Sequence, residues 1–216
     1  MAITLATGTQ VAIASTYGPV RNMTAITNAT EAVATLEASH GIIVGDYFEV
    51  TSGWDLLNGR IARAKTVATN DVTMENINTA ATSRYPAGTG TGSVREITAW
   101  TTIGQISQDI QVAGGEQQFA DITTLADRVQ KQIPTTRNPI QVTLPLFDDP
   151  ALAFVAVVRS VAEAAAATAV RFTFPNGSIM VANAYWSYQD VPTIQDSTLR
   201  NAIDLTFIGF PTRYTS

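Results

Sequence analysis

The chain of 216 residues contains no cysteine and only one histidine. The absence of cysteine excludes structural disulfide bonds and metal sites built on thiolates. A zinc site needs several imidazole or thiolate ligands, which His40 alone cannot supply. His40 stands in Ser-His-Gly, where we expect a surface turn, and no flanking pattern supports a Ser-His-acid triad. We therefore predict no catalytic residue, no metal and no other cofactor.

Charge is also scarce. Charged residues make up 14% of the chain, against about 25% in typical domains. The net charge is -5, and the 13 basic residues are dispersed, which disfavours a module that grips nucleic acid through its phosphates. A surface with so few charges indicates that much of it is covered by partners.

Long apolar runs are missing as well. No stretch approaches the ~18 residues of a membrane-spanning helix. The segment MAITLATGTQVAIAS at the start lacks the positive region of a secretory signal, so we expect synthesis in the cytoplasm. The sequence GTGTGS at Gly88–Ser93 lacks the lysine and the following helix of a phosphate loop, and we expect a flexible loop there.

Short β-like runs separated by turn signals fill most of the chain. A turn is expected at Tyr17–Pro19, and Asp127–Asn138 is polar. The candidate strands are Val11–Ala14, Thr24–Thr27, Ala32–Leu36, Tyr47–Thr51, Arg60–Ala68, Val72–Glu75, Val94–Thr102, Ile103–Val112, Phe119–Ala126, Pro139–Phe147, Ala169–Phe174, Ile179–Tyr188 and Thr198–Ile208.

One helix is predicted, in the alanine-rich run after FDDP. Asp149 is a suitable N-cap, which also accounts for the acidic pair Asp148-Asp149, and Pro150 suits the first helical position. Arg159 and Glu163 can pair weakly across one turn. An apolar stripe predicts packing on a sheet; it consists of Phe154, Val158, Val161 and Ala165. The fold class is therefore mainly β: an antiparallel β-sandwich or barrel with one α-helix packed on it, plus a small inserted β-domain.

Two features of the last third are specific. Asn176-Gly177 between two apolar runs predicts a tight hairpin. In Thr198–Ile208, apolar residues alternate with mixed ones, as in a half-solvated antiparallel strand. The apolar set is Leu199, Ile203, Leu205 and Phe207; the mixed set is Arg200, Ala202, Asp204 and Thr206.

Three segments together resemble a known family. They are VRFTFPNGSIMVANAYWSYQD, the alanine-rich helix after FDDPAL, and the closing strand LRNAIDLTFIGFPTRY. From Trp100 to Tyr214 the chain resembles the major tail tube proteins of long, non-contractile-tailed, lambda-like bacteriophages. By this resemblance, residues 1–19 are an N-terminal arm and first strand, and residues 99–216 are the tube core. Residues 20–98 depart from the family, whose compact members have a much shorter connection there; we expect an inserted small β-domain, and the sequence leaves open whether it faces outward.

The resemblance implies a structural virion protein of the phage tail. Its subunits would form hexameric rings that stack into a hollow tube through which DNA passes. The implied partners are further copies of the chain, tail terminator, tape measure and tail tip proteins, and DNA in transit without specific binding; no membrane is implied. The helix would lie outside the sheet and a long loop would reach the adjacent ring.

This resemblance yields two sets of candidate residues. Arg200, Asp204 and Thr206 on the mixed face are candidates for the lumen wall or a subunit interface. The loop from Gly114 to Asn138 is the candidate contact between rings, through Glu116, Asp121, Asp127, Arg128 and Lys131.

Two other classes of function stay open on the residues alone. A virion decoration or carbohydrate-binding β-domain within Ser39–Thr98 would need an exposed aromatic platform, for which Tyr47 and Trp54 are possible members. A tryptophan in a turn is more often part of the core. An enzyme based on carboxylates ranks third, because no acidic pair stands out.

Overall fold

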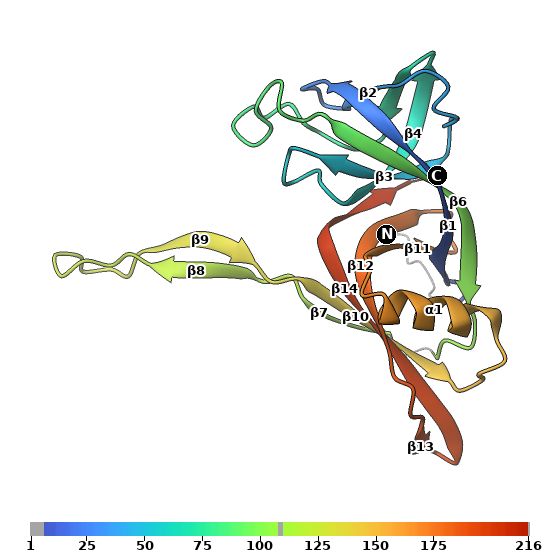
Figure 1. Ribbon diagram of the computed structural model, residues 1–216. Helices are drawn as coiled ribbons and strands as arrows, with labels where there is room; N and C mark the ends of the chain where they lie inside the picture. The colour runs from blue at the N-terminus through green and yellow to red at the C-terminus, as the bar shows by residue number, and fades with distance from the viewer. Residues whose placement is uncertain (1–6, 108–109, 216) are drawn as a thin grey trace.

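The computed structural model of the protein describes residues 7–107 and 110–215. It is mainly β with one helix, as predicted from the sequence (Figure 1). Residues 1–6 of the predicted N-terminal arm lie outside the described part. The elements are β1 (Gln10–Ile26), β2 (Val33–Leu36), β3 (Tyr47–Ser52), β4 (Arg60–Ala68), β5 (Asp71–Met74), β6 (Gly92–Ile103), β7 (Gln111–Gly114), β8 (Gln117–Asp121), β9 (Gln132–Arg137), β10 (Ile140–Phe147), α1 (Ala153–Glu163), β11 (Thr168–Thr173), β12 (Ile179–Tyr188), β13 (Thr193–Gln195) and β14 (Thr198–Tyr214).

The first half of the chain forms a closed barrel. The strands pair in the order β2-β5-β4-β3-β6-β1, and β2 pairs back to β1, so this barrel has no free edge among the described strands. Its core includes Phe48, Val50, Trp54, Leu57, Met74 and Ile77. The indole nitrogen of Trp54 donates to the carbonyl oxygen of Pro86 at 2.8 Å, so this side chain is part of the core.

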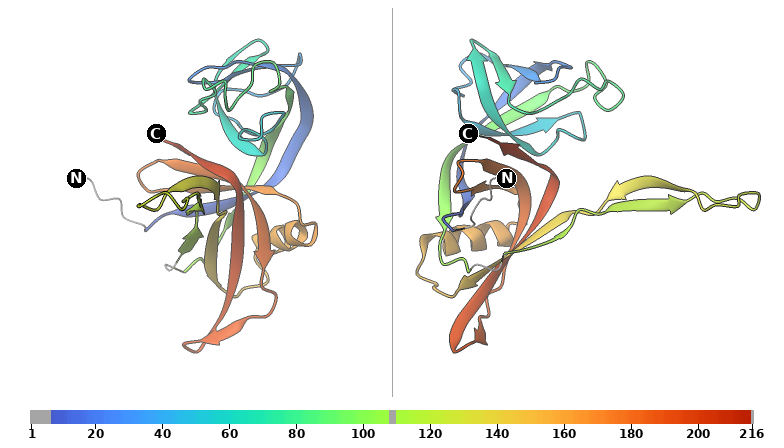
Figure 2. Two further views of the ribbon diagram at one scale, coloured as in Figure 1. Left: turned by 90° about the vertical axis from the view of Figure 1, so that its left-hand side faces the viewer. Right: turned by 180° about the vertical axis from the view of Figure 1, so that it is seen from behind.

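The second half forms a curled sheet, in the order β6-β1-β11-β12-β14-β10-β7. Val11 and Ile103 at one end of this sheet share a core with Val142 and Leu144 at the other. The sheet therefore curls until its two ends face each other across one core, as in a sandwich. α1 packs on the concave side against β12, β6 and β1, with Phe154 and Val158 buried (Figures 1 and 2).

The barrel and the curled sheet share β1 and β6 and a buried junction. The Tyr214 hydroxyl accepts a hydrogen bond from the backbone nitrogen of Arg63 at 2.9 Å. The Asn183 amide donates to the Glu49 carboxylate at 2.8 Å. The predicted boundaries near residues 19 and 98 fall inside these shared strands, and the division into domains stays a prediction.

The turn predicted at Tyr17–Pro19 is wrong, because β1 runs through it. Pro19 has no N–H to give to a strand ladder. The pairing of β1 with β6 shifts register between Tyr17 and Val20, and such an irregularity accommodates the proline without ending the strand.

The helix starts later than predicted. Its N-cap is Leu152, which makes no side-chain cap hydrogen bond. Asp149 instead accepts from the backbone nitrogen of Ala151 at 3.1 Å, in a turn that precedes the helix. Arg159 pairs with Asp190 at 2.8 Å rather than with Glu163, because β12 brings Asp190 close to the helix.

His40 is buried rather than exposed, with 6% of its surface accessible. Its Nδ1 accepts a hydrogen bond from the backbone nitrogen of Ile42 at 3.1 Å. Nε2 lies 3.1 Å from the carbonyl oxygen of Thr69, so Nε2 is placed to donate a hydrogen bond while Nδ1 accepts one. The histidine closes a turn between two strands of the barrel.

Strand predictions between residues 103 and 138 were partly wrong. The predicted strand Ile103–Val112 is interrupted, since β6 ends at Ile103 and β7 begins at Gln111; its residues 108–109 lie outside the described part. The predicted strand Phe119–Ala126 ends at Asp121. The polar segment after it contains β9, whose Pro134 faces Phe119.

Candidate assembly surfaces

Arg200, Asp204 and Thr206 lie on one face of β14, opposite the face that packs on α1. Ile203, Leu205 and Phe207 are buried on the α1 face, as the alternation predicted, whereas Leu199 is 50% exposed. The outer face of β10, β14 and the end of β12 is therefore a polar wall. We call this surface the polar face; it comprises Gln141, Thr143, Pro145, Phe147, Tyr185, Ser187, Arg200, Ala202, Asp204 and Thr206.

The polar face carries little charge. Asp204 accepts a hydrogen bond from the Thr143 hydroxyl at 2.6 Å and stands opposite Ser187 on the other side. The Arg200 guanidinium lies 4.8 Å from the centre of the Phe147 ring, which covers its flat side. The barrel covers the far end of the same sheet face, where Asn183 meets Glu49. The barrel is thus on the side of the sheet opposite α1.

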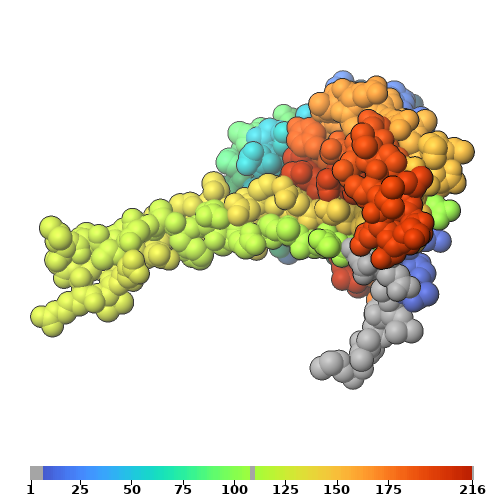
Figure 3. All heavy atoms as spheres, turned by 90° about the horizontal axis from the view of Figure 1, so that it is seen from below, coloured from blue at the N-terminus to red at the C-terminus, as the bar shows by residue number. Residues whose placement is uncertain are grey.

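The predicted inter-ring loop is a long two-stranded arm formed by β8 and β9. It projects away from the body in Figure 1, in the right-hand view of Figure 2 and in Figure 3. Apolar side chains on it are exposed: Phe119, Ile122, Leu125, Val129 and Ile133. An isolated two-stranded hairpin is marginally stable in water, so this arm is suited to be covered by another chain.

The five candidate charges lie along this arm. Asp127 and Lys131 form an ion pair at the tip, and hydrogen bonds from Lys131 and Thr124 lower the pKa of Asp127. Hydrogen bonds from Thr123 likewise lower the pKa of Asp121. Glu116 lies at the base, where its backbone carbonyl accepts from the Asn138 nitrogen at 3.0 Å. Arg128 makes no ion pair within the described part of the chain.

The curled sheet has two unpaired edges among the described strands. β7 pairs only with β10, and all four of its residues are exposed. On the other side, β3 covers β6 only as far as Glu96, which leaves the outer edge of Ile97–Ile103 unpaired. Exposed edges invite pairing with another chain unless they are protected.

A second projection was missed in the sequence. β13 and the start of β14 form a hairpin whose turn residues Asp196 and Ser197 have φ values of 50° and 61°. Two successive left-handed residues make a type I′ turn, for which Asp-Gly or Asn-Gly is the usual signal. Asp-Ser is a weaker signal, so the turn was not recognised.

The predicted Asn-Gly hairpin is confirmed between β11 and β12. The backbone nitrogen of Gly177, at φ 79°, donates to the Phe174 carbonyl at 2.9 Å. Arg213, from the closing motif, donates to the Ser178 hydroxyl at 3.0 Å and stacks over Phe174 at 4.8 Å. Two of the three segments on which the family resemblance rests are therefore in contact.

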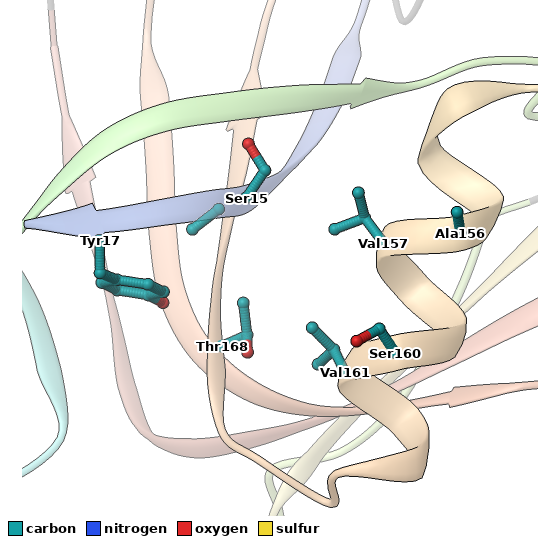
Figure 4. Close-up of a pocket in the computed structure, with 8 residues that line it drawn as sticks. Ser15, Tyr17, Ala156, Val157, Ser160, Val161 and Thr168 are labelled. Carbon is teal, nitrogen blue, oxygen red and sulfur yellow. The ribbon is translucent and has the colours of Figure 1, made fainter.

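A pocket of about 420 Å³ lies between α1 and β1 (Figure 4). Ser160, Val157 and Val161 project from the helix toward Ser15 and Thr168. The serine hydroxyls have no imidazole or carboxylate among the lining residues, so this pocket lacks a base that could activate them. Tyr17, also in the lining, accepts a hydrogen bond from the Ala169 nitrogen at 2.9 Å, and burial raises its pKa to about 12.

Within residues 7–107 and 110–215, no group of three or more His, Cys, Asp or Glu side chains could hold a metal ion. Nor does that part of the chain contain a helix with the length and hydropathy to cross a membrane.

A polar face, unpaired sheet edges and two projecting hairpins define a structural β protein with surfaces suited to contact other chains. The family model described as "Phage tail tube protein, TTP" matches residues 52–216. The chain belongs to this family of phage tail tube proteins, and it is accordingly a structural component of the virion tail.

Two other comparisons add little. No curated protein sequence matches the chain. Among solved structures, a chain of "Cryo-EM structure of the anti-feeding prophage (AFP) baseplate, 6-fold symmetrised" aligns with a TM-score of 0.39 and 11% identity. The alignment covers 55% of this chain and 86% of that chain. At this score the similarity carries no argument.

Proposed function

We propose that the protein is the major tail tube subunit of a long, non-contractile, lambda-like phage tail. Copies assemble into hexameric rings, the rings stack into a hollow tube, and DNA passes through the tube into the host. Tail terminator, tape measure and tail tip proteins are its other partners, and its role is structural rather than enzymatic. The protein is made in the cytoplasm of the bacterial host.

The observation that carries this proposal is the pair of unpaired edges at opposite ends of one curled sheet. A contact between two different edges of identical subunits is head-to-tail, and such a contact gives a ring when its rotation closes. Edge pairing also satisfies backbone groups that would otherwise stay exposed.

The polar face is the candidate lumen wall. DNA slides along a wall that is polar but not basic, because each exposed cation would bind phosphate. Asp204 supplies negative charge there, Thr206 is neutral, and Arg200 is stacked on Phe147. The barrel packs on this same side of the sheet, whereas α1 lies on the opposite side, which would face the tube's exterior. In this arrangement the barrel would lie at one end of the ring wall and not on the exterior.

Replacing Asp204 by lysine tests the lumen assignment. We expect tubes to assemble while DNA ejection slows several-fold or stops, because each ring gains a set of phosphate-binding cations. Asp55→Lys, in an exposed barrel loop, is the matched control and should eject normally. Normal ejection by phage particles carrying Asp204→Lys would remove the support for a luminal Asp204.

A further inference from the structure

The β13–β14 hairpin carries an uncovered apolar patch. Val191 is 75% exposed, Ile194 is 81% exposed and Leu199 is 50% exposed. Ile194 and Leu199 are direct cross-strand partners, so they present one continuous surface. The hairpin that carries these residues faces the viewer in the view from below (Figure 3), separate from the β8–β9 arm.

An apolar groove of about 640 Å³ is lined by residues of β1, β7, β10, β11 and the start of β12. Its lining includes Ile110, Val112, Phe172, Phe174 and Met180, and no charged side chain lines it. A groove of this size with apolar walls suits a few aliphatic side chains better than a polar ligand.

The patch and the groove cannot meet within one chain. Leu199 is the second residue of β14, whereas Met180 at the groove pairs with Arg213 near the end of β14. Even Val142, the groove residue whose partner on β14 is nearest to Leu199, pairs with Leu205, six residues further along the strand. At about 3.3 Å per residue this is a separation of roughly 20 Å. A contact between them must join two copies head-to-tail.

Charge favours the hairpin over the arm as the occupant. The Arg213 guanidinium lies 4.8 Å from the ring centre of Phe174, which lines the groove, and Arg213 is exposed. Asp196 at the hairpin turn is also exposed. Neither forms an ion pair in the part of the chain that the structure describes. The arm tip instead carries charges of both signs, two of which already pair with each other.

We propose that the β13–β14 hairpin of one copy inserts Val191, Ile194 and Leu199 into the apolar groove of the next copy, with Asp196 beside Arg213. This inference rests on the proposed self-assembly. It makes the β13–β14 hairpin a second projecting element, besides the β8–β9 arm, that joins copies of the chain. The contact is head-to-tail: each copy offers one hairpin and one groove, so the contact propagates along the assembly.

Cysteine cross-linking tests the contact, and the chain has no native cysteine to interfere. Ile194→Cys is combined in one chain with Val112→Cys, Phe174→Cys or Met180→Cys, and assembled protein is oxidised. We expect a ladder of covalent multimers on a non-reducing gel for at least one of these pairs. Each single variant should give dimers at most, and Ile194→Cys with Val44→Cys in the barrel should give no ladder.

The outcomes separate this contact from the proposed function. Tubes without a ladder from any groove pair would overturn the hairpin contact while leaving the tube subunit intact. A ladder from Leu125→Cys with Met180→Cys instead would assign the groove to the arm, and would also overturn it. Failure of the unmodified protein to form any assembly would count against the proposed function itself.

A charge substitution gives a second readout. Val191→Asp should abolish assembly, because it places a carboxylate in an apolar groove. The control is Val20→Asp, because Val20 is also an exposed valine, 62% accessible, but lies on the barrel. This variant should assemble normally. Equal assembly by the two variants, with unchanged melting temperatures, would contradict the contact.

Discussion

Individual side chains at the junction decide how the barrel is held on the sheet. Tyr17 and Tyr214 each accept a hydrogen bond from a backbone nitrogen of a distant strand, of Ala169 and Arg63 respectively. Arg95 stacks over the Tyr17 ring at 3.9 Å and also pairs with Glu49 at 2.6 Å. Such contacts fix orientation as well as adding stability, because hydrogen bonds are directional.

Because of the Tyr17 hydroxyl, we expect the free energy of unfolding to fall at alkaline pH. Burial raises its pKa from 10.0 to about 12, so the unfolded state loses this proton first. The stabilisation is present below pH 10 and is lost as the pH rises toward 12, at a cost of roughly 2–3 kcal/mol. Burial also raises the pKa of Tyr214, which acts in the same direction.

Urea unfolding at pH 9 and pH 11.5 measures this effect. Tyr17→Phe should show a smaller loss of unfolding free energy between the two pH values than the unmodified protein. Tyr185→Phe is the control, because that side chain is 51% exposed, and it should keep the full loss. An equal loss in both variants would show that Tyr17 is not the titrating group.

At the scale of elements, the arm is the part whose structure depends least on the rest of the chain. All but one of the residues in β8 and β9 are exposed. Glu116 and Asn138 at its base are already joined by a backbone hydrogen bond of 3.0 Å, so residues 117–137 can be replaced by a short Gly-Ser turn.

That deletion should leave a folded monomer that does not polymerise. The melting temperature should change little, because no buried core residue is removed. Sedimentation and electron microscopy measure assembly. The control is a chain with the same short Gly-Ser segment inserted in the exposed barrel turn near Gly88. Normal tubes from the deleted chain would contradict the assignment of the arm to contacts between rings.

The elements also show what the sequence could predict. Alternation predicted the strands β10 and β14, and the Asn-Gly signal predicted the hairpin between β11 and β12, because these rules are local. The helix start, the path of β1 through Pro19 and the burial of His40 depend on partners distant in sequence. The candidate residues on β14 do share one face, but the apolar hairpin beyond it was missed, since its Asp196-Ser197 turn is a weak signal.

At the scale of the whole molecule, the surfaces not used in folding are grouped rather than scattered. The polar face, the β7 edge, the arm and the β13–β14 hairpin all belong to or project from the curled sheet. The barrel has a closed ladder and four internal ion pairs, so it offers few unsatisfied groups. We therefore expect copies of the chain to assemble through the curled sheet and the elements that project from it.

Cryo-electron microscopy of the purified full chain at increasing concentration tests that account most directly. It predicts stacked rings or tubes with the polar face toward the lumen, the edges of neighbouring sheets adjacent and the arm on the next ring. Monodisperse monomers at high concentration, or tubes lined by α1 instead of the polar face, would contradict it.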